Sequence, residues 1–286
     1  MTSTSTKIRS HAVSTKRFLN PIRIALHLWQ YRYLIFQFTW REVVGRYKGS
    51  FLGIGWSFIH PLMMLAVYTF VFSVVFKAKW GISVGESRTA FALTLFMGII
   101  TFNLLGETVN LSATVILANA NYVKKVVFPL EILPLVKFLG VLVNNLFSLS
   151  VLLFGLLVFN QSIPWTALLL PVVWFPIMLL SLGCGYFLAS LGVFIRDVSA
   201  TIGILTTILF FLTPILYPVR AVPERYRFFS RINPLALFVE DSRRVVLWGI
   251  LPDWTYFFYG LVFSLVVFVF GFVWFMKSKK AFADVI

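Results

Sequence analysis

Residues 138–195 read FLGVLVNNLFSLSVLLFGLLVFNQSIPWTALLLPVVWFPIMLLSLGCGYFLASLGVFI, a run of 58 residues without Asp, Glu, Lys or Arg. A helix needs about 20 apolar residues to cross the hydrocarbon core of a bilayer, so this run is too long for one span. The polar turn at residues 160–164, NQSIP, divides it into two. The run therefore predicts two membrane-spanning helices joined by a short turn.

The other charge-free stretches and the composition predict an all-α integral membrane protein. Of the 286 residues, 59% are hydrophobic and 12% are charged, roughly half the charged share of a soluble domain. This balance excludes a disordered chain and argues against a soluble enzyme. Six membrane-spanning helices are expected near residues 54–76, 89–116, 131–159, 165–193, 199–217 and 254–276.

The basic residues set the expected orientation. The chain carries 25 Lys and Arg against 10 Asp and Glu, a net charge of +15. In short connections of membrane proteins, Lys and Arg favour the cytoplasmic side, so we read this surplus as orienting the spans and not as a nucleic-acid surface. With both termini in the cytosol, 15 of these residues fall inside, 9 outside and 1 within a helix. We expect that topology, with residues 1–20 as a flexible cytosolic tail and 21–286 as one transmembrane domain.

An amphipathic segment precedes the first span. Apolar and aromatic residues recur from 22 to 47 at steps of four and three, which is one face of a helix, and Arg23 and Arg41 fall on the other side. Aromatic groups on one face and arginine on the other are typical of a helix that lies in the lipid headgroup layer. We expect residues 22–47 to form one interfacial helix. A cytosolic helix packed on a partner subunit is the alternative.

Catalytic and ATP-binding motifs are missing from the sequence. It has no Gly-x-x-x-x-Gly-Lys-Ser/Thr loop and no Gly-x-Ser-x-Gly turn, and its three histidines have no metal-ligand spacing. The adjacent acids Glu240 and Asp241 would point about 100° apart on a helix, so they do not readily share a substrate atom. Glu107 is the deepest carboxylate, either hydrogen-bonded to a neighbouring helix or a proton site. We expect no enzyme activity, cofactor or metal in this chain.

Two connections are more than simple turns. The basic loop 118–129, ANANYVKKVVFP, either only marks the cytosolic side or forms the contact for a cytosolic motor. Residues 218–253 place six arginines outside, against the charge rule, and contain apolar runs too short to span. We expect 219–250 to form a re-entrant helix pair that dips back from the outer side. The alternative is a folded cap whose arginines bind the phosphates of membrane lipids.

Several short motifs occur together over residues 22–277. They are Arg46-Tyr47-Lys48-Gly49-Ser50-x-Leu52-Gly53, Trp56, His60-Pro61-Leu62, Tyr68-x-Phe70-Val71-Phe72, Asn121-Tyr122-Val123-Lys124-Lys125-x-x-Phe128-Pro129, Arg196-Asp197, Thr213-Pro214-Ile215-x-Tyr217-Pro218 and Ile232-Asn233-Pro234. In order and spacing they resemble the permease subunits of type-2 ABC exporters for polysaccharides, such as O-antigen, teichoic acid and some capsules. His60 departs from the family pattern, in which Asn or another polar residue is expected before the proline.

The resemblance implies a function and partners. The chain would be the channel-forming subunit of an ATP-driven exporter of lipid-linked polysaccharide in the bacterial plasma membrane. It would act as a homodimer with two ATP-binding subunits, which would hold the ATP and Mg, and residues 121–128 would be the coupling helix. The first and fifth spans of both copies would form most of the channel. The alternatives are a permease of this architecture for a lipid, drug or other small molecule, and a membrane-embedded glycan-modifying enzyme.

Four groups of candidate site residues follow. Coupling to the ATPase is expected at Asn121, Tyr122, Lys124, Lys125, Val126 and Phe128. Candidates for the pore lining, where aromatic faces suit sugar rings, are Trp56, His60, Tyr68, Phe72, Thr206, Thr207 and Thr213, with ordinary helix contacts as the alternative for each. Substrate access at the interfacial helix is expected at Trp29, Tyr33, Trp40, Arg41, Arg46 and Lys48. The re-entrant segment and exit are expected at Arg220, Arg225, Arg243 and Arg244.

Overall fold

The computed structural model of the protein describes residues 18–75, 80, 88–124, 128–160 and 162–286. These ranges form helices joined by turns and contain no strand. The helices are α1 (Pro21–Trp29), α2 (Arg32–Gly45), α3 (Trp56–Tyr68), α4 (Arg88–Ser112), α5 (Ala120–Val123), α6 (Ile132–Asn160), α7 (Leu170–Phe194), α8 (Val198–Leu212), α9 (Arg227–Ile232), α10 (Pro234–Val246), α11 (Trp254–Ser278) and α12 (Phe282–Val285).

The helix lengths confirm an all-α membrane protein. In the described ranges, five helical stretches are long and apolar enough to cross a bilayer, namely Gly53–Phe72, Thr89–Ser112, Ile132–Phe159, Trp165–Phe194 and Trp254–Val285. The remaining expected span, 199–217, is shorter in the structure, because α8 ends at Leu212. Thr213 is extended, as favoured for the residue before a proline, and Pro214 has no N–H to continue the helix.

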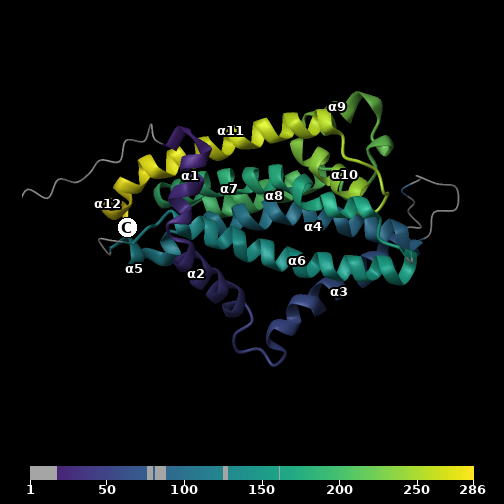
Figure 1. Cartoon of the computed structure of the whole chain (residues 1–286), viewed down its shortest axis with the longest axis horizontal. Helices are drawn as coiled ribbons and strands as arrows, with labels where there is room; N and C mark the ends of the chain where they lie inside the picture. The colour runs from purple at the N-terminus through teal and green to yellow at the C-terminus, as the bar shows by residue number, and fades with distance from the viewer. Residues whose placement is uncertain (1–17, 76–79, 81–87, 125–127, 161) are drawn as a thin grey trace, which may run out of the picture.

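The long helices lie side by side along one direction of the molecule (Figure 1). Helix α7 packs on α11, and α4 contacts α6, α7, α8 and α10. Helices α1, α5 and α12 lie at one end of the bundle, here named the α5 end, and α9 lies at the opposite end, the α9 end. The bundle therefore has two distinct ends, and α4 runs through its middle.

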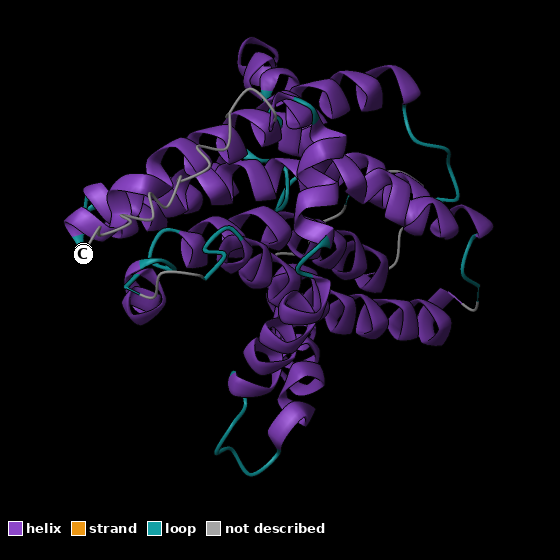
Figure 2. Ribbon diagram, turned by 60° about the vertical axis from the view of Figure 1, so that its left-hand side comes forward, coloured by secondary structure: helices purple, strands orange, loops and turns teal. Residues whose placement is uncertain are grey.

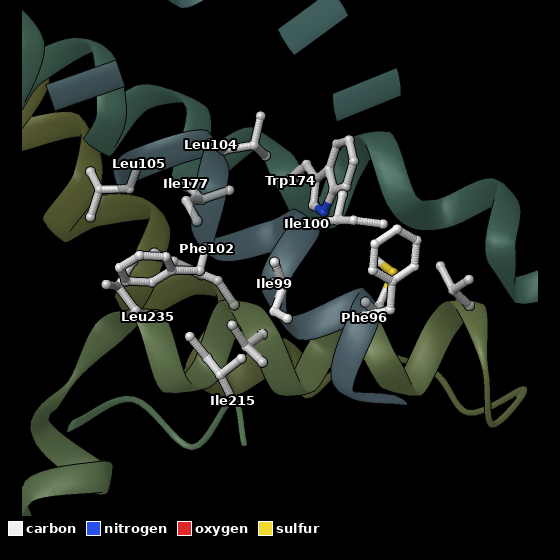
Figure 3. Close-up of a cluster of buried hydrophobic side chains, with 14 of the residues drawn as sticks. Phe96, Ile99, Ile100, Phe102, Leu104, Leu105, Trp174, Ile177, Ile215 and Leu235 are labelled. Carbon is white, nitrogen blue, oxygen red and sulfur yellow. The ribbon is translucent and has the colours of Figure 1, made fainter. Parts of the chain in front are cut away.

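The core has two parts. The larger is centred on α4, where Phe96, Ile100 and Leu104 pack against Trp174 and Ile177 of α7 (Figure 3). The smaller lies at the α5 end and joins α1, α7, α11 and α12. Its fully or almost fully buried side chains include Phe18, Ile24, Tyr186, Phe272, Phe275 and Phe282.

The segment expected to be one interfacial helix, 22–47, is two helices. The backbone leaves the helical conformation at Tyr31, where φ is −99° and ψ is 13°. Asn20 caps α1 by accepting a hydrogen bond from the Ile22 N–H at 2.9 Å. Helix α1 runs across the bundle and buries Ile24 at the α5 end, whereas α2 runs obliquely along the bundle onto α6 (Figure 1). The helix breaks at Tyr31 because α1 and α2 pack on different parts of the bundle and run in different directions.

The apolar side of this segment faces away from the protein. Leu26, Trp29, Tyr33, Phe36 and Trp40 are all more than half exposed. The helices α2 and α3 and the turn between them project from the bundle, as Figure 2 shows. In a bilayer these exposed side chains would contact lipid.

The segment expected to re-enter the membrane contains a helix pair of unequal length. Helix α9 has six residues and α10 has 13. Asn233 separates them and caps α10 by accepting a hydrogen bond from the Leu235 N–H at 3.0 Å. Helix α10 then packs against α4, α7 and α11, so it runs into the bundle.

Two glycines allow the close approach of α7 and α11. A methyl group added at Gly271 of α11 would overlap the carbonyl oxygen of Gly183 of α7, and one added at Gly183 would overlap the backbone at Phe268. Small residues at such contacts let helix backbones approach closely within membranes.

We predict that Gly271→Ala destabilises the protein by about 1–3 kcal/mol, because α7 and α11 must move apart. Gly203→Ala in α8 is the matched control, since the nearest atom to a methyl group there is 3.9 Å away. Thermal unfolding in detergent measures both. Equal melting temperatures for the two variants would contradict this account of the α7–α11 contact.

Candidate functional site

A cavity of about 690 Å³ lies between α3, α4, α6 and the turn after α2. Trp56, His60 and Tyr68, three of the predicted pore residues, line it. Arg46 and Lys48, expected at substrate access, line it as well. The structure thus brings together two groups of residues that the sequence assigned to separate sites.

Polar residues of α4 and α6 also line this cavity, and most of them were not predicted from the sequence. Asn103 and Glu107 come from α4, and Asn144, Asn145 and Ser148 come from α6. Their helical spacing of three or four residues within otherwise apolar spans was the signal that could have identified them.

A second cavity of about 370 Å³ adjoins the first and shares Asn103, Glu107 and Phe210 with it. The predicted pore residues Thr206 and Thr207 of α8 line this part. The two cavities follow α4 between α3 and α8, and we name them together the α4 groove.

Many polar groups of the α4 groove have partners across helices. The Tyr47 hydroxyl donates a hydrogen bond to the Asn144 side-chain oxygen at 2.9 Å. The Asn110 amide donates to the Thr206 hydroxyl at 3.1 Å. These contacts give the polar groups hydrogen-bond partners within an otherwise apolar bundle. The groove offers hydroxyl, amide and aromatic surfaces together, which suits a sugar.

Two predicted pore residues do not line the α4 groove. The Phe72 ring lies 6.1 Å from the Phe91 ring, centroid to centroid, in an aromatic contact. Thr213 is fully buried and accepts a hydrogen bond from the Asn233 amide at 2.9 Å. These two residues make contacts within the bundle, which was the alternative to lining a pore: Phe72 follows the end of α3 and Thr213 follows the end of α8.

The loop expected to couple to an ATPase packs on α2. The rings of Tyr122 and Phe128 stack with 4.4 Å between centroids, and Phe38 of α2 lies 5.5 Å from Phe128. Tyr122 and Phe128, expected to contact a cytosolic motor, are therefore partly covered by α2 of this chain. Asn121 and Lys124 are exposed. Lys125 and Val126 lie outside the described residues.

The residues expected at substrate access divide into three sets. Trp29, Tyr33 and Trp40 face outwards, Arg41 contacts the coupling loop, and Arg46 and Lys48 line the α4 groove. The Arg41 guanidinium lies 4.4 Å from the Phe38 ring centroid and donates to the Tyr122 hydroxyl at 3.4 Å. Helix α2 thus contacts the coupling loop through Arg41. The turn that follows α2 lines the α4 groove.

Residues 33–247 match the family described as ABC-2 type transporter. The chain belongs to that family. It is 29% identical over 234 residues to the O-antigen export system permease protein RfbA of Myxococcus xanthus. The aligned region covers 81% of this chain and 87% of that protein. A protein of the same name from Klebsiella pneumoniae is 25% identical to this chain, and the aligned region covers 88% of this chain and 95% of that protein. The polysialic acid transport protein KpsM of Escherichia coli is 23% identical to this chain, and the aligned region covers 84% of this chain and 92% of that protein.

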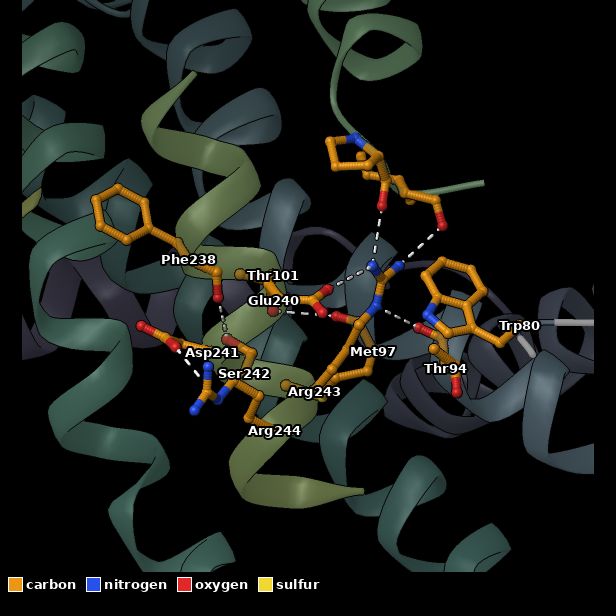
Figure 4. A network of polar contacts seen from close by, with 12 residues as sticks. Trp80, Thr94, Met97, Thr101, Phe238, Glu240, Asp241, Ser242, Arg243 and Arg244 are labelled. Atoms are coloured by element: carbon orange, nitrogen blue, oxygen red, sulfur yellow. Dashed lines mark hydrogen bonds and ion pairs between the residues drawn. The ribbon is translucent and has the colours of Figure 1, made fainter. Parts of the chain in front are cut away.

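Arg243 of this ABC-2 family member is a structural residue. Its side chain is 0% exposed, and its guanidinium donates hydrogen bonds of 2.9 Å to the carbonyl oxygens of Thr94, Pro214 and Ile215 (Figure 4). Gly98 leaves room for it, because a methyl group there would overlap the guanidinium. The expectation that Arg243 lines an exit is therefore wrong for this structure: burial and three carbonyl partners leave it no exposed donor.

The other predicted exit arginines lie nearer the surface at the α9 end. Arg220 is exposed, although it donates a hydrogen bond to the Trp80 carbonyl oxygen. Arg225 is exposed and lies over the Tyr226 ring at 4.5 Å. Arg244 is half-buried and donates to the Leu251 carbonyl oxygen at 3.0 Å. These contacts hold the segment around α9 and α10 in place.

Glu131 joins three segments at the α5 end of this ABC-2 family member. Its carboxylate accepts hydrogen bonds from His27 of α1 at 2.9 Å and from Lys279 after α11 at 2.5 Å. Burial alone would raise the pKa of Glu131, but the hydrogen bond to His27 and the charge of Lys279 lower it from 4.5 to about 2. The carboxylate therefore stabilises the contact of α1, the coupling loop and the C-terminal helices.

We predict that lowering the pH removes this stabilisation. Because the pKa of Glu131 is lower in the folded protein, its ionised form adds to the free energy of unfolding, on the order of 3 kcal/mol. This contribution is fully present above about pH 4.5 and is lost as the pH falls towards about 2. Tryptophan fluorescence during thermal unfolding measures it between pH 6 and pH 3. Glu131→Gln should lower the melting temperature at pH 6 and flatten its decline with acid.

Glu224→Gln is the control for this prediction, since the Glu224 side chain is 90% exposed. It should follow the wild-type curve. An unchanged pH dependence in Glu131→Gln would contradict the role given to Glu131.

Proposed function

We propose that this chain is the membrane-spanning subunit of an ATP-driven exporter that moves polysaccharide across the bacterial plasma membrane. The α4 groove carries the proposal. Each sugar hydroxyl that loses its water costs about 1–3 kcal/mol unless it finds a partner, so a glycan needs a continuous polar path. Amides on α4 and α6 suit the hydroxyls, and the rings of Trp56 and Tyr68 suit the apolar sugar faces. Relatives named for O-antigen export and polysialic acid transport support the same cargo class.

A second copy of the chain completes the path in this proposal. The α4 groove runs along one chain and is bordered by α3 and α8. Two copies related by a two-fold axis would set two such grooves face to face, since a two-fold interface uses the same surface of each copy. Exposed apolar side chains of α8, including Ile204, Ile208 and Phe211, are suited to that contact.

Separate ATP-binding subunits supply the energy in this proposal, because the sequence has no phosphate-binding loop. They would bind the α5 end, where Asn121 and Lys124 are exposed. That end then lies in the cytosol together with both termini. Movement of the coupling loop would reach α2 through the rings of Tyr122, Phe128 and Phe38.

Deleting the gene from its source bacterium tests the cargo. We expect the surface glycan to disappear and to accumulate inside the cell, and the wild-type gene to restore it. Complementation with Trp56→Ala should lower export roughly fivefold, the effect of losing about 1 kcal/mol of aromatic contact with sugar.

Trp165→Ala is the matched control, because Trp165 is 69% exposed and lies outside the α4 groove. Immunoblots of membranes would confirm equal amounts of protein. A normal surface glycan in the deletion strain, without internal accumulation, would contradict the proposed cargo.

A charge reversal tests the coupling loop. Lys124→Glu with Lys125→Glu should remove ATP-driven export while the chain still inserts and folds, because the reversed charge would repel the surface of the ATP-binding subunit that binds this loop. Lys277→Glu with Lys280→Glu, at exposed positions of the same end, should export normally. Full export by the first double variant would rule out this coupling site.

A further inference from the structure

The turn after α2 places two cations in the α4 groove. Arg46 caps the C-terminal end of α2, and Lys48 follows in the turn. Arg46 donates to the Glu107 carboxylate of α4 at 2.6 Å. Among the described residues, Lys48 has no carboxylate within 4.0 Å. This end of the groove therefore carries one more positive than negative charge.

The Arg46–Glu107 pair is accessible from the groove. The two side chains are 27% and 30% exposed, and both line the larger cavity. Ion pairs with this much exposure contribute little to stability, because water competes for both charges. A diffusible anion can therefore replace Glu107 on Arg46 at small cost.

We propose that Arg46 and Lys48 form a binding site for an oxyanion carried by the exported glycan, and that Glu107 occupies this site when no cargo is bound. The ligand class is a carboxylate of an acidic sugar or a phosphate linked to the glycan. The planar guanidinium of Arg46 matches the two oxygens of either group, and the Lys48 ammonium supplies a second charge. This inference rests on the proposed export function for the nature of the cargo.

The surroundings of the pair suit a sugar that bears such an anion. Trp56 and His60 of α3 line the same cavity, and so does Asn103, one helical turn from Glu107 on α4. An anion held at Arg46 would place the attached sugar rings against these groups. Cargo binding would also separate Glu107 from Arg46 and so release the turn after α2 from α4.

Binding measurements on the permease with its ATP-binding partner in phosphatidylcholine nanodiscs test the proposal. The probes are a hyaluronan tetrasaccharide, which carries carboxylates, farnesyl pyrophosphate, which carries a phosphate-type anion, and maltotetraose, which is neutral. We expect at least one acidic probe to bind more tightly than maltotetraose, and the binding to weaken with added salt. The acidic probe that binds identifies the source of the anion.

Three variants locate the site. Glu107→Gln should bind the acidic probe roughly fivefold more tightly, because the competing carboxylate is gone, and Arg46→Gln should bind it at least roughly fivefold more weakly. Glu42→Gln is the matched control and should not change binding, because Glu42 has a similar ion pair with Lys137 (2.7 Å, 23% exposed) that does not line the groove.

Equal binding of acidic and neutral probes, with no salt dependence in the wild-type protein, would overturn the proposal whatever the variants do. So would weaker binding of the acidic probe by a folded Glu107→Gln variant. In either case a loss of surface glycan in the deletion strain would leave the export function standing. Selective binding of an acidic probe with a normal surface glycan in that strain would instead remove the export function.

Discussion

The hydrocarbon interior of a bilayer offers no hydrogen-bond partners, and the described structure depends on how the chain meets that constraint. Helix α10 and its neighbours show the solution most clearly. The backbone near Pro214 and Ile215 has left the helical conformation, and the buried Arg243 donates hydrogen bonds to both of their carbonyl oxygens. Non-helical backbone at membrane depth is tolerated where protein surrounds it. A single arginine therefore connects α10, the end of α8 and the beginning of α4.

The same constraint explains why the α4 groove is informative. Polar side chains within membrane helices are costly, so their concentration between α3, α4, α6 and α8 indicates a polar path. The Tyr47–Asn144 contact joins the turn after α2 to α6, and Asn110–Thr206 joins α4 to α8, so these groups are paired. Helix α2 connects the groove to the coupling loop, since Arg41 contacts Tyr122 and Arg46 contacts Glu107. These contacts form a continuous route from the coupling loop at the α5 end to the α4 groove.

The sequence predicted the helices well and the directions of side chains poorly. Charge-free runs located the spans because each span needs a minimum apolar length, and the turn at 160–164 was visible from its polar residues. The break at Tyr31 was not visible, because the apolar steps of four and three continue across it. Arg243 was expected in the re-entrant segment and exit, and Thr213 was a candidate for the pore lining, yet both are buried. Which side of a helix faces a neighbour depends on the contacts of the whole bundle.

We propose that the α4 groove is a water-filled path that polysaccharide occupies during export. Cysteine accessibility tests it most directly, starting from a Cys184→Ser chain, since Cys184 is the single cysteine of the protein. Asn103→Cys places a thiol in the lining of the α4 groove, and Phe154→Cys places one on the exposed apolar surface of α6. In vesicles with the ATP-binding subunits, the account predicts that a water-soluble thiol reagent labels only the cysteine at 103, and that glycan export under ATP turnover protects it. No labelling at 103 in any state, or labelling that exported glycan leaves unchanged, would contradict the account.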